Sequence, residues 1–244
     1  VLNRANQTIE HKHFYDIVDL LDENTLLVLN NTKVLPARLY GTKETGAKIE
    51  VFLLESKSGK EWSCLIKPSK RVKPDTIIKI SDELQVRAIK RLEEDGEWLV
   101  EMIYAGDLFE ILHKVGNIPL PPYIKRKIQN EELKNFDMER YQTVYAHHEG
   151  AIAAPTAGLH FTPEILEKVP HRFVTLHVGV GTFRPVKAEN IEDHHMHTES
   201  FFMSPETSQA IEEAKRVIAV GTTSVRVMET LATRYGRPLR TGPG

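Results

Sequence analysis

Residues 217–224 read Val217-Ile218-Ala219-Val220-Gly221-Thr222-Thr223-Ser224, a short apolar run followed by a glycine and three hydroxyl residues. A continuous apolar run of this length is typical of a strand buried on both faces. Residues 225–231 then place apolar side chains at helical spacing, which predicts a helix after the glycine. A strand, a loop and a helix in this order form the repeating unit of a parallel sheet covered by helices.

The same pattern occurs elsewhere in the chain. Leu26-Leu27-Val28-Leu29 predicts a second buried strand, with a helical pattern over residues 14–21 before it, and Phe173-Val174-Thr175-Leu176-His177-Val178 predicts a third strand that ends at Gly179. Thr162-Pro163-Glu164 and Ser204-Pro205-Glu206 have the capping hydroxyl, proline and acid of a helix start. Because the carboxyl ends of parallel strands meet at one edge of a sheet, the loops 30–33, 179–185 and 221–224 are expected together.

Residues 48–104 have a different character. Apolar residues alternate with polar ones in short runs, and turn sequences such as Ser56-Lys57-Ser58-Gly59 separate these runs. This spacing is typical of a small all-β unit, a barrel or a sandwich. We therefore predict an α/β fold, a largely parallel sheet with helices, that carries an inserted all-β barrel domain. The expected division is 1–42 and 117–244 for the discontinuous α/β catalytic domain and 43–116 for the barrel.

Two further segments lie near the end of this insert. Residues 107–115 have a helical pattern, and the prolines at 119, 121 and 122 then require an extended chain. Residues 125–140 are polar and charged, so we expect a mobile surface stretch there.

Composition narrows the class of protein. No apolar run approaches the roughly 18–20 residues of a membrane span, so we expect no membrane association. Cys64 is the only cysteine, which rules out a disulfide within the chain and suggests a cytoplasmic location with a buried, unreactive thiol. The net charge of −2 neither indicates nor excludes nucleic acid as a partner, because the arrangement of charge decides this. The chain lacks an initiator methionine and stops at a turn, so we expect further residues at both ends.

Two glycine-containing loops could bind a ligand. Gly221-Thr222-Thr223-Ser224 at a helix start offers free N–H groups and hydroxyls to a carboxylate or phosphate, and a capped helix without a ligand is the alternative. Gly179-Val180-Gly181-Thr182-Phe183-Arg184-Pro185 permits close approach of the backbone to a ligand and adds a cationic Arg184, and a structural turn is the alternative. The proline rules out a dinucleotide-binding fingerprint, because it interrupts the helix that this motif needs.

Several histidines could carry chemistry. His194, His195 and His197 suggest a metal site, but their spacing does not align them on one helical face, so a base or hydrogen-bond donor is the favoured interpretation. His160 precedes a capped helix, where a packed, hydrogen-bonded histidine is the alternative to a functional one.

Taken together, these segments resemble one family, the S-adenosylmethionine:tRNA ribosyltransferase-isomerases of queuosine biosynthesis. The resemblance covers essentially the whole chain. The motifs that carry it, in order, are Leu29-Asn30-Asn31-Thr32-Lys33-Val34-Leu35-Pro36-Ala37-Arg38-Leu39, Leu120-Pro121-Pro122-Tyr123-Ile124, Arg140-Tyr141-Gln142-Thr143-Val144-Tyr145-Ala146, Ala153-Ala154-Pro155-Thr156-Ala157-Gly158-Leu159-His160-Phe161, Thr175-Leu176-His177-Val178-Gly179-Val180-Gly181-Thr182-Phe183-Arg184-Pro185-Val186, Met196-His197-Thr198-Glu199 and Ala219-Val220-Gly221-Thr222-Thr223-Ser224-Val225-Arg226.

The resemblance implies transfer and isomerisation of the ribosyl part of S-adenosylmethionine onto 7-aminomethyl-7-deazaguanine at the wobble position of tRNA. The product would be epoxyqueuosine, with adenine and methionine released. S-adenosylmethionine would be a consumed co-substrate, no separate cofactor or metal would be needed, and we expect a monomer. The family also has an additional N-terminal segment and a longer C-terminal part, and residues 168–172 and 215–217 look shorter than the corresponding family loops.

We expect proton transfer from His160 together with His177 or His197, because these histidines lie beside the glycine-rich loops. The residues expected to bind substrate are Asn31, Arg38, Thr156, Gly158, Gly179, Gly181, Thr182, Arg184, Gly221, Thr222, Thr223 and Arg226. Two other functions remain open from the sequence: a hydrolase with a histidine-bound metal at His194, His195 and His197, and a tRNA-binding module without catalysis.

Overall fold

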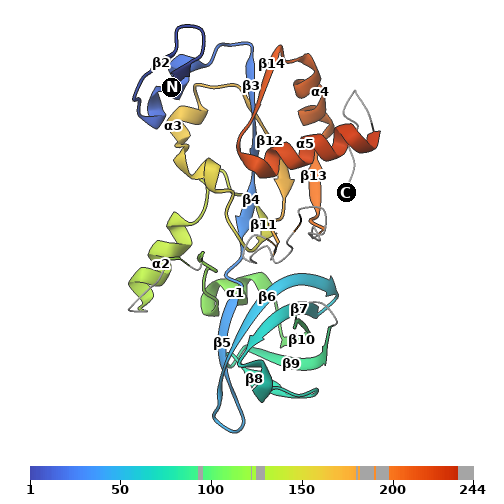
Figure 1. The fold of residues 1–244 in the computed structure, drawn as a ribbon. Helices are drawn as coiled ribbons and strands as arrows, with labels where there is room; N and C mark the ends of the chain where they lie inside the picture. The colour runs from blue at the N-terminus through green and yellow to red at the C-terminus, as the bar shows by residue number, and fades with distance from the viewer. Residues whose placement is uncertain are drawn as a thin grey trace.

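The computed structural model describes residues 1–92, 96–121, 123–124, 130–179, 181, 190 and 198–235. These residues form an α/β unit and a β-barrel, one above the other in the view of Figure 1. The expected fold class, α/β with an inserted barrel, is confirmed.

The α/β unit is built on a sheet with strand order β13-β12-β3-β14. The central strand β3 (Thr25–Asn30) runs parallel to β12 (His171–Leu176) on one side and to β14 (Arg216–Ala219) on the other. Strand β13 (Phe201–Met203) pairs antiparallel with β12. Every residue of β3 is buried, as its continuous apolar run predicts.

Helices cover both faces of this sheet because successive side chains of β3 point to opposite sides. Leu26 and Val28 pack in a core that includes residues of α4 (Pro205–Glu213) and α5 (Gly221–Tyr235). Leu27 and Leu29 pack in a second core against α3 (Pro163–Leu166) and the 3-10 helix η1 (Phe14–Leu20). Ser204 and Thr162 accept hydrogen bonds from Thr207 N–H and Ile165 N–H, so both predicted helix starts are capped.

The second unit is a closed antiparallel barrel with strand order β10-β7-β6-β5-β8-β9. The strands are β5 (Arg38–Lys43), β6 (Lys48–Ser58), β7 (Glu61–Lys67), β8 (Ile77–Lys79), β9 (Leu84–Arg91) and β10 (Trp98–Tyr104). Trp98, Met102 and Cys64 lie in the barrel core, and Cys64 is a free cysteine whose thiol pKa is raised by burial. Strand β5 begins at Arg38, ahead of the boundary expected at residue 43, and the division into domains stays a prediction.

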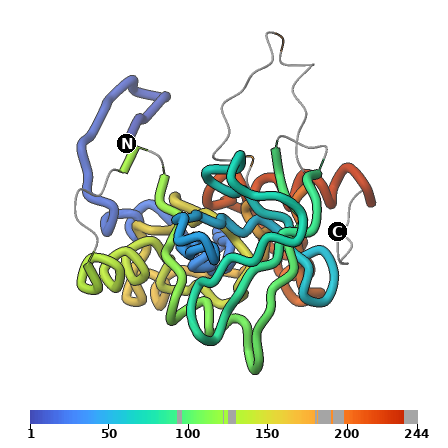
Figure 2. The backbone as a smooth tube through the Cα atoms, turned by 90° about the horizontal axis from the view of Figure 1, so that it is seen from below, coloured from blue at the N-terminus to red at the C-terminus, as the bar shows by residue number. Residues whose placement is uncertain are grey.

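The connection between the units consists of a two-stranded ribbon and a helix. Strand β4 (Thr32–Val34) follows β3, pairs parallel with β11 (His148–Ala151) and leads into β5. Helix α1 (Leu108–Val115) follows the barrel and buries Leu112 in the barrel core. In Figure 2, seen from below, the barrel lies in front of the α/β unit.

The remaining elements are short. Strands β1 (Leu2–Asn3) and β2 (Thr8–Ile9) pair as a separate ribbon near the N-terminus, and η2 (Ser69–Arg71) and η3 (Thr156–His160) are 3-10 helices. No helix among the described residues is long and apolar enough to cross a membrane.

The mobile surface stretch expected over residues 125–140 is wrong in its second part. Residues 131–140 form helix α2 (Glu131–Arg140). Asn130 caps it by accepting a hydrogen bond from Leu133 N–H, and Glu131 and Glu132 lie at its positive end. These local signals form a helix although the stretch has no continuous apolar face.

Candidate functional site

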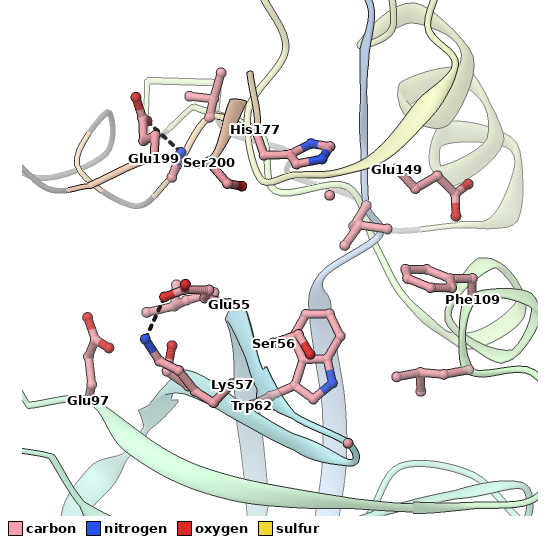
Figure 3. Close-up of a pocket in the computed structure, with 18 of the residues that line it drawn as sticks. Glu55, Ser56, Lys57, Trp62, Glu97, Phe109, Glu149, His177, Glu199 and Ser200 are labelled. Atoms are coloured by element: carbon pink, nitrogen blue, oxygen red, sulfur yellow. Dashed lines mark hydrogen bonds and ion pairs between the residues drawn. The ribbon is translucent and has the colours of Figure 1, made fainter. Parts of the chain in front are cut away.

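A cleft of about 690 Å³ lies between the α/β unit and the barrel. The barrel contributes Glu55, Ser56 and Trp62 among others, and α1 contributes Phe109. The α/β side contributes Glu149, His177 and Glu199, and Figure 3 shows them on the opposite side of the cleft from the barrel residues. This volume fits a small molecule or a single nucleotide rather than a folded polymer.

His177 is placed in the cleft by the carboxyl end of β12. Its Nδ1 lies 2.8 Å from Oγ1 of Thr32, which the neighbouring strand β4 supplies. Burial lowers the pKa of the imidazole, and the charge of nearby His148 lowers it further. The ring is therefore neutral at pH 7, a state in which one ring nitrogen can accept a proton.

Gly150 makes room for this ring. It lies in β11 at φ +153°, where the register with β4 shifts between Glu149 and Ala151. A Cβ on Gly150 would lie 2.7 Å from both Cε1 and Nδ1 of His177. Because such a contact is too close for carbon, only glycine fits beneath the histidine.

Glu199 connects the end of β12 to helix α5. Its Oε1 accepts a hydrogen bond of 2.8 Å from the Gly179 N–H, and its Oε2 pairs with Nη1 of Arg226. The side chain of Glu199 is only 10% exposed, so this carboxylate is held between a backbone donor and a guanidinium.

Glu149 joins three elements on the α/β side of the cleft. Its Oε1 lies 2.8 Å from Nζ of Lys33 in β4 and 2.6 Å from Nε2 of His113 in α1. Burial raises the pKa of Glu149, but the hydrogen bonds from Lys33 and His113 outweigh it, so the pKa is lowered and the carboxylate is ionised at pH 7.

Asparagine side chains fix the sheet edge beside the cleft. Asn30 donates to the Leu176 carbonyl at 3.0 Å and accepts from the Leu176 N–H at 3.0 Å. Asn31, one of the expected substrate-binding residues, accepts a hydrogen bond of 2.7 Å from the Thr175 hydroxyl. The carboxyl ends of β3 and β12 are thereby held together by side chains as well as by backbone pairing.

A second group of expected residues gathers where η3 meets the start of α5. Gly221, at φ +82°, lies beside Ala157, and a Cβ there would lie 3.1 Å from the Ala157 Cβ. Gly158 lies under the Tyr145 hydroxyl, 2.0 Å from where a Cβ would be. The other members of this group are Thr156, Thr222 and Thr223. Within the part of the chain that the structure describes, this group does not contribute to the lining of the cleft.

The remaining expected residues lie elsewhere or outside the described part. His160 is exposed and its ring lies 5.2 Å from that of Phe14. Arg38 lies in the barrel, where it pairs with Glu50 at 2.9 Å. Gly181 is described but is not among the residues that line the cleft. His197, Thr182 and Arg184 lie outside the described residues. Of the expected residues, His177 and Gly179 line the cleft, and Arg226 reaches it through Glu199.

Most residues that line the cleft were not expected from the sequence, and three of them, Glu199, Glu149 and Phe109, matter for the site. Glu199 lies in the quoted motif at residues 196–199, so the sequence marked this segment, but it gave no sign that Glu199 would line the cleft. Glu149 follows two histidines in what the sequence suggests is a loop, and Phe109 lies in an amphipathic helix. Nothing in the local pattern separates these two from ordinary surface residues, because the cleft is formed by segments distant in sequence.

No group of three or more His, Cys, Asp or Glu side chains that could hold a metal ion occurs in the described part of the chain. His194, His195 and His197, the residues of the metal hypothesis, lie outside that part.

The fold and the cleft define an α/β protein with an inserted antiparallel barrel and a polar, ligand-sized site between the two units. The queuosine biosynthesis protein family matches residues 1–242, and the chain belongs to this family. This match confirms the family suggested by the sequence motifs.

Among solved structures, the chain is similar to an S-adenosylmethionine tRNA ribosyltransferase from Thermotoga maritima. The two are 31% identical in sequence, with a TM-score of 0.36. The match covers 96% of this chain and 65% of that protein, so the chain spans just under two thirds of its relative's length.

Proposed function

We propose that the protein transfers and isomerises the ribosyl moiety of S-adenosylmethionine onto 7-aminomethyl-7-deazaguanine at the wobble position of tRNA. The product is epoxyqueuosine-tRNA, and adenine and methionine leave. The observation that carries this proposal is a cleft with a neutral, hydrogen-bonded histidine at a sheet edge, in a chain of the queuosine biosynthesis family. The name of the Thermotoga maritima relative, an S-adenosylmethionine tRNA ribosyltransferase, supports the same chemistry.

The reaction needs several proton transfers. The sulfonium of S-adenosylmethionine acidifies the C5′ protons, and a base removes one of them to give an ylide. The aminomethyl nitrogen must lose a proton before it attacks the ribose, and adenine must gain one as it leaves. The base must be unprotonated near neutral pH, and His177 supplies a neutral imidazole in the cleft because burial lowers its pKa.

Thr32 can set the tautomer of His177. Its hydroxyl lies 3.5 Å from the His148 carbonyl oxygen, which can only accept, and 2.8 Å from Nδ1 of His177. When the hydroxyl donates to the carbonyl, it accepts from Nδ1–H, and Nε2 is left as the proton acceptor. His177 is therefore our proposed base, with His160 and His197 as the other proposed participants in proton transfer.

The group at η3 and α5 is a proposed anion site. Helix α5 begins at Gly221, and its first N–H groups and the Thr222 and Thr223 hydroxyls suit a methionine carboxylate or a tRNA phosphate. The Thr223 hydroxyl oxygen is buried, and no protein partner for it occurs among the described residues. We also propose that substrate is bound by Asn31, Arg38, Arg184 and Arg226.

The direct test is incubation of the full-length protein with S-adenosylmethionine and tRNA that carries 7-aminomethyl-7-deazaguanine. We expect free adenine and a nucleoside with the mass of epoxyqueuosine. tRNA with guanine at the same position is the matched control and should yield neither product. A protein that binds this tRNA but releases no adenine would instead be a binding module, and the proposal would be rejected.

A further inference from the structure

Phe109 is an exposed aromatic side chain inside a polar cleft. It lies near the start of α1, is 38% exposed and lines the cleft. Large apolar side chains of an amphipathic helix usually pack into the core, as those of Leu108, Ile111 and Leu112 in α1 do. Phe109 instead presents its ring to the space between the two units, as Figure 3 shows.

The orientation of α1 is fixed from both sides. Leu112 and its apolar neighbours anchor the helix in the barrel core, and His113 contacts Glu149 of β11 at 2.6 Å. Phe109 and His113 are four residues apart, so they lie on the same side of the helix. The bond between His113 and Glu149 therefore turns the side that carries Phe109 toward the α/β unit.

A polar acceptor, Glu149, lines the same cleft as Phe109. Among the described residues, Lys33 and His113 both contact Oε1 of Glu149. An ionised carboxylate has lone pairs on both oxygens, so Oε2 can accept a hydrogen bond from a ligand. An aromatic face beside a carboxylate suits a flat heterocycle with N–H donors on its edge.

We propose that Phe109 is the stacking platform of a subsite for a planar, purine-like base, with Glu149 as the acceptor for the N–H groups at its edge. This inference rests on the proposed function, because that reaction brings two such bases to the protein. One is the adenine of S-adenosylmethionine, and the other is the 7-deazaguanine presented by tRNA. The subsite takes one of these bases and leaves the other outside the Phe109 contact.

The test measures binding without turnover, by calorimetry on the full-length protein. One probe is S-adenosylhomocysteine, which carries adenosine but has no sulfonium. The other is an anticodon stem-loop with 7-aminomethyl-7-deazaguanine at the wobble position, compared with the same stem-loop lacking a base there. The variants are Phe109→Ala, Phe109→Leu and Phe109→Tyr, and Phe136→Ala on α2 is the matched control because Phe136 is 51% exposed and does not line the cleft.

We expect Phe109→Ala to weaken binding of one probe roughly tenfold, because stacking on an aromatic side chain is worth about this much per base. Phe109→Tyr and Phe136→Ala should bind both probes as the wild type does, and Phe109→Leu should be nearly as weak as Phe109→Ala. Weakened S-adenosylhomocysteine binding assigns the platform to adenine, and loss of the difference between the two stem-loops assigns it to the acceptor base.

Two results would overturn the inference. Wild-type affinity of Phe109→Ala for both probes would show that no base stacks there, and full binding by Phe109→Leu would show that an apolar but non-planar side chain suffices. If Phe109→Ala or Phe109→Leu binds both probes as the wild type does, and the wild type still releases adenine, the stacking inference fails but the proposed function stands. If the wild type binds neither probe, the proposed function fails together with it.

Discussion

The burial of His177 gives the stability of the protein a defined dependence on pH. A histidine whose pKa is lower in the folded than in the unfolded state binds fewer protons when folded. Its contribution to stability is therefore present above the unfolded pKa of about 6.5 and is lost as the pH falls through the lowered folded value.

The substitution His177→Gln should remove this contribution. We expect the free energy of unfolding of the wild type, measured with denaturant, to rise more steeply with pH than that of the variant as the pH approaches about 6.5. Parallel curves for the two proteins across this range would mean that the folded protein does not depress the pKa of His177.

Gly150→Ala tests the fit between β11 and the histidine. The new methyl carbon would lie 2.7 Å from Cε1 and Nδ1 of His177, so the ring must move. A displacement of about 1 Å at a catalytic group can cost roughly 100-fold in rate, and we expect a loss of this order in adenine release.

Gly46→Ala is the control for this substitution. Gly46 also has a positive φ, of +77°, but no atom lies within 4 Å of its added Cβ. We expect Gly46→Ala to lower the free energy of unfolding without a comparable loss in the rate of adenine release. Equal rates for Gly150→Ala and the wild type would refute the proposed role of the His177 ring position.

Glu199 links helix α5 to the end of β12 by polar contacts, in addition to the apolar core that both elements share. Glu199 accepts from the Gly179 N–H and pairs with Arg226, whose side chain is 38% exposed. Solvent screening of this exposed partner limits the energy of the pair, so we expect a coupling free energy of about 1 kcal/mol.

A double-mutant cycle with Glu199→Gln and Arg226→Met measures this coupling. Glutamine keeps an oxygen that can accept from Gly179, so the cycle isolates the contact with Arg226. Free energies of unfolding that simply add would show that the two elements are not coupled through this pair.

The elements differ in how far the sequence could predict them. Strand β3 was predictable because both of its faces are buried, which requires a continuous apolar run. Helix α2 was missed because its fold depends on the Asn130 cap and acidic first turn rather than on an apolar stripe. For the site, the position of His177 near the carboxyl end of a predicted strand indicated the sheet edge that borders the cleft. Phe109 could not be found in this way, because its contact with the cleft depends on how the barrel is placed.

The whole molecule has a net charge of −2, whereas its proposed substrate, tRNA, is a polyanion. Affinity for tRNA must then come from local basic surface, such as the exposed cluster of Lys67, Lys70, Arg71 and Lys73 on the barrel. We expect the logarithm of the tRNA binding constant to fall linearly with the logarithm of salt concentration, measured by filter binding or anisotropy.

Binding of S-adenosylhomocysteine serves as the control, because it releases few counterions and should change little over the same range. A tRNA affinity that is constant between low and high salt would contradict a phosphate-binding surface on this protein.

In our proposal, the ribosyl group is transferred in the cleft between the two units, with His177 as the base. Single-turnover release of adenine, with both substrates saturating, tests it in the wild type and in His177→Ala. We expect one adenine for each modified tRNA in the wild type and a rate lowered roughly 10²–10⁴-fold in the variant, with both substrates still bound. Adenine release at the wild-type rate from His177→Ala would contradict it.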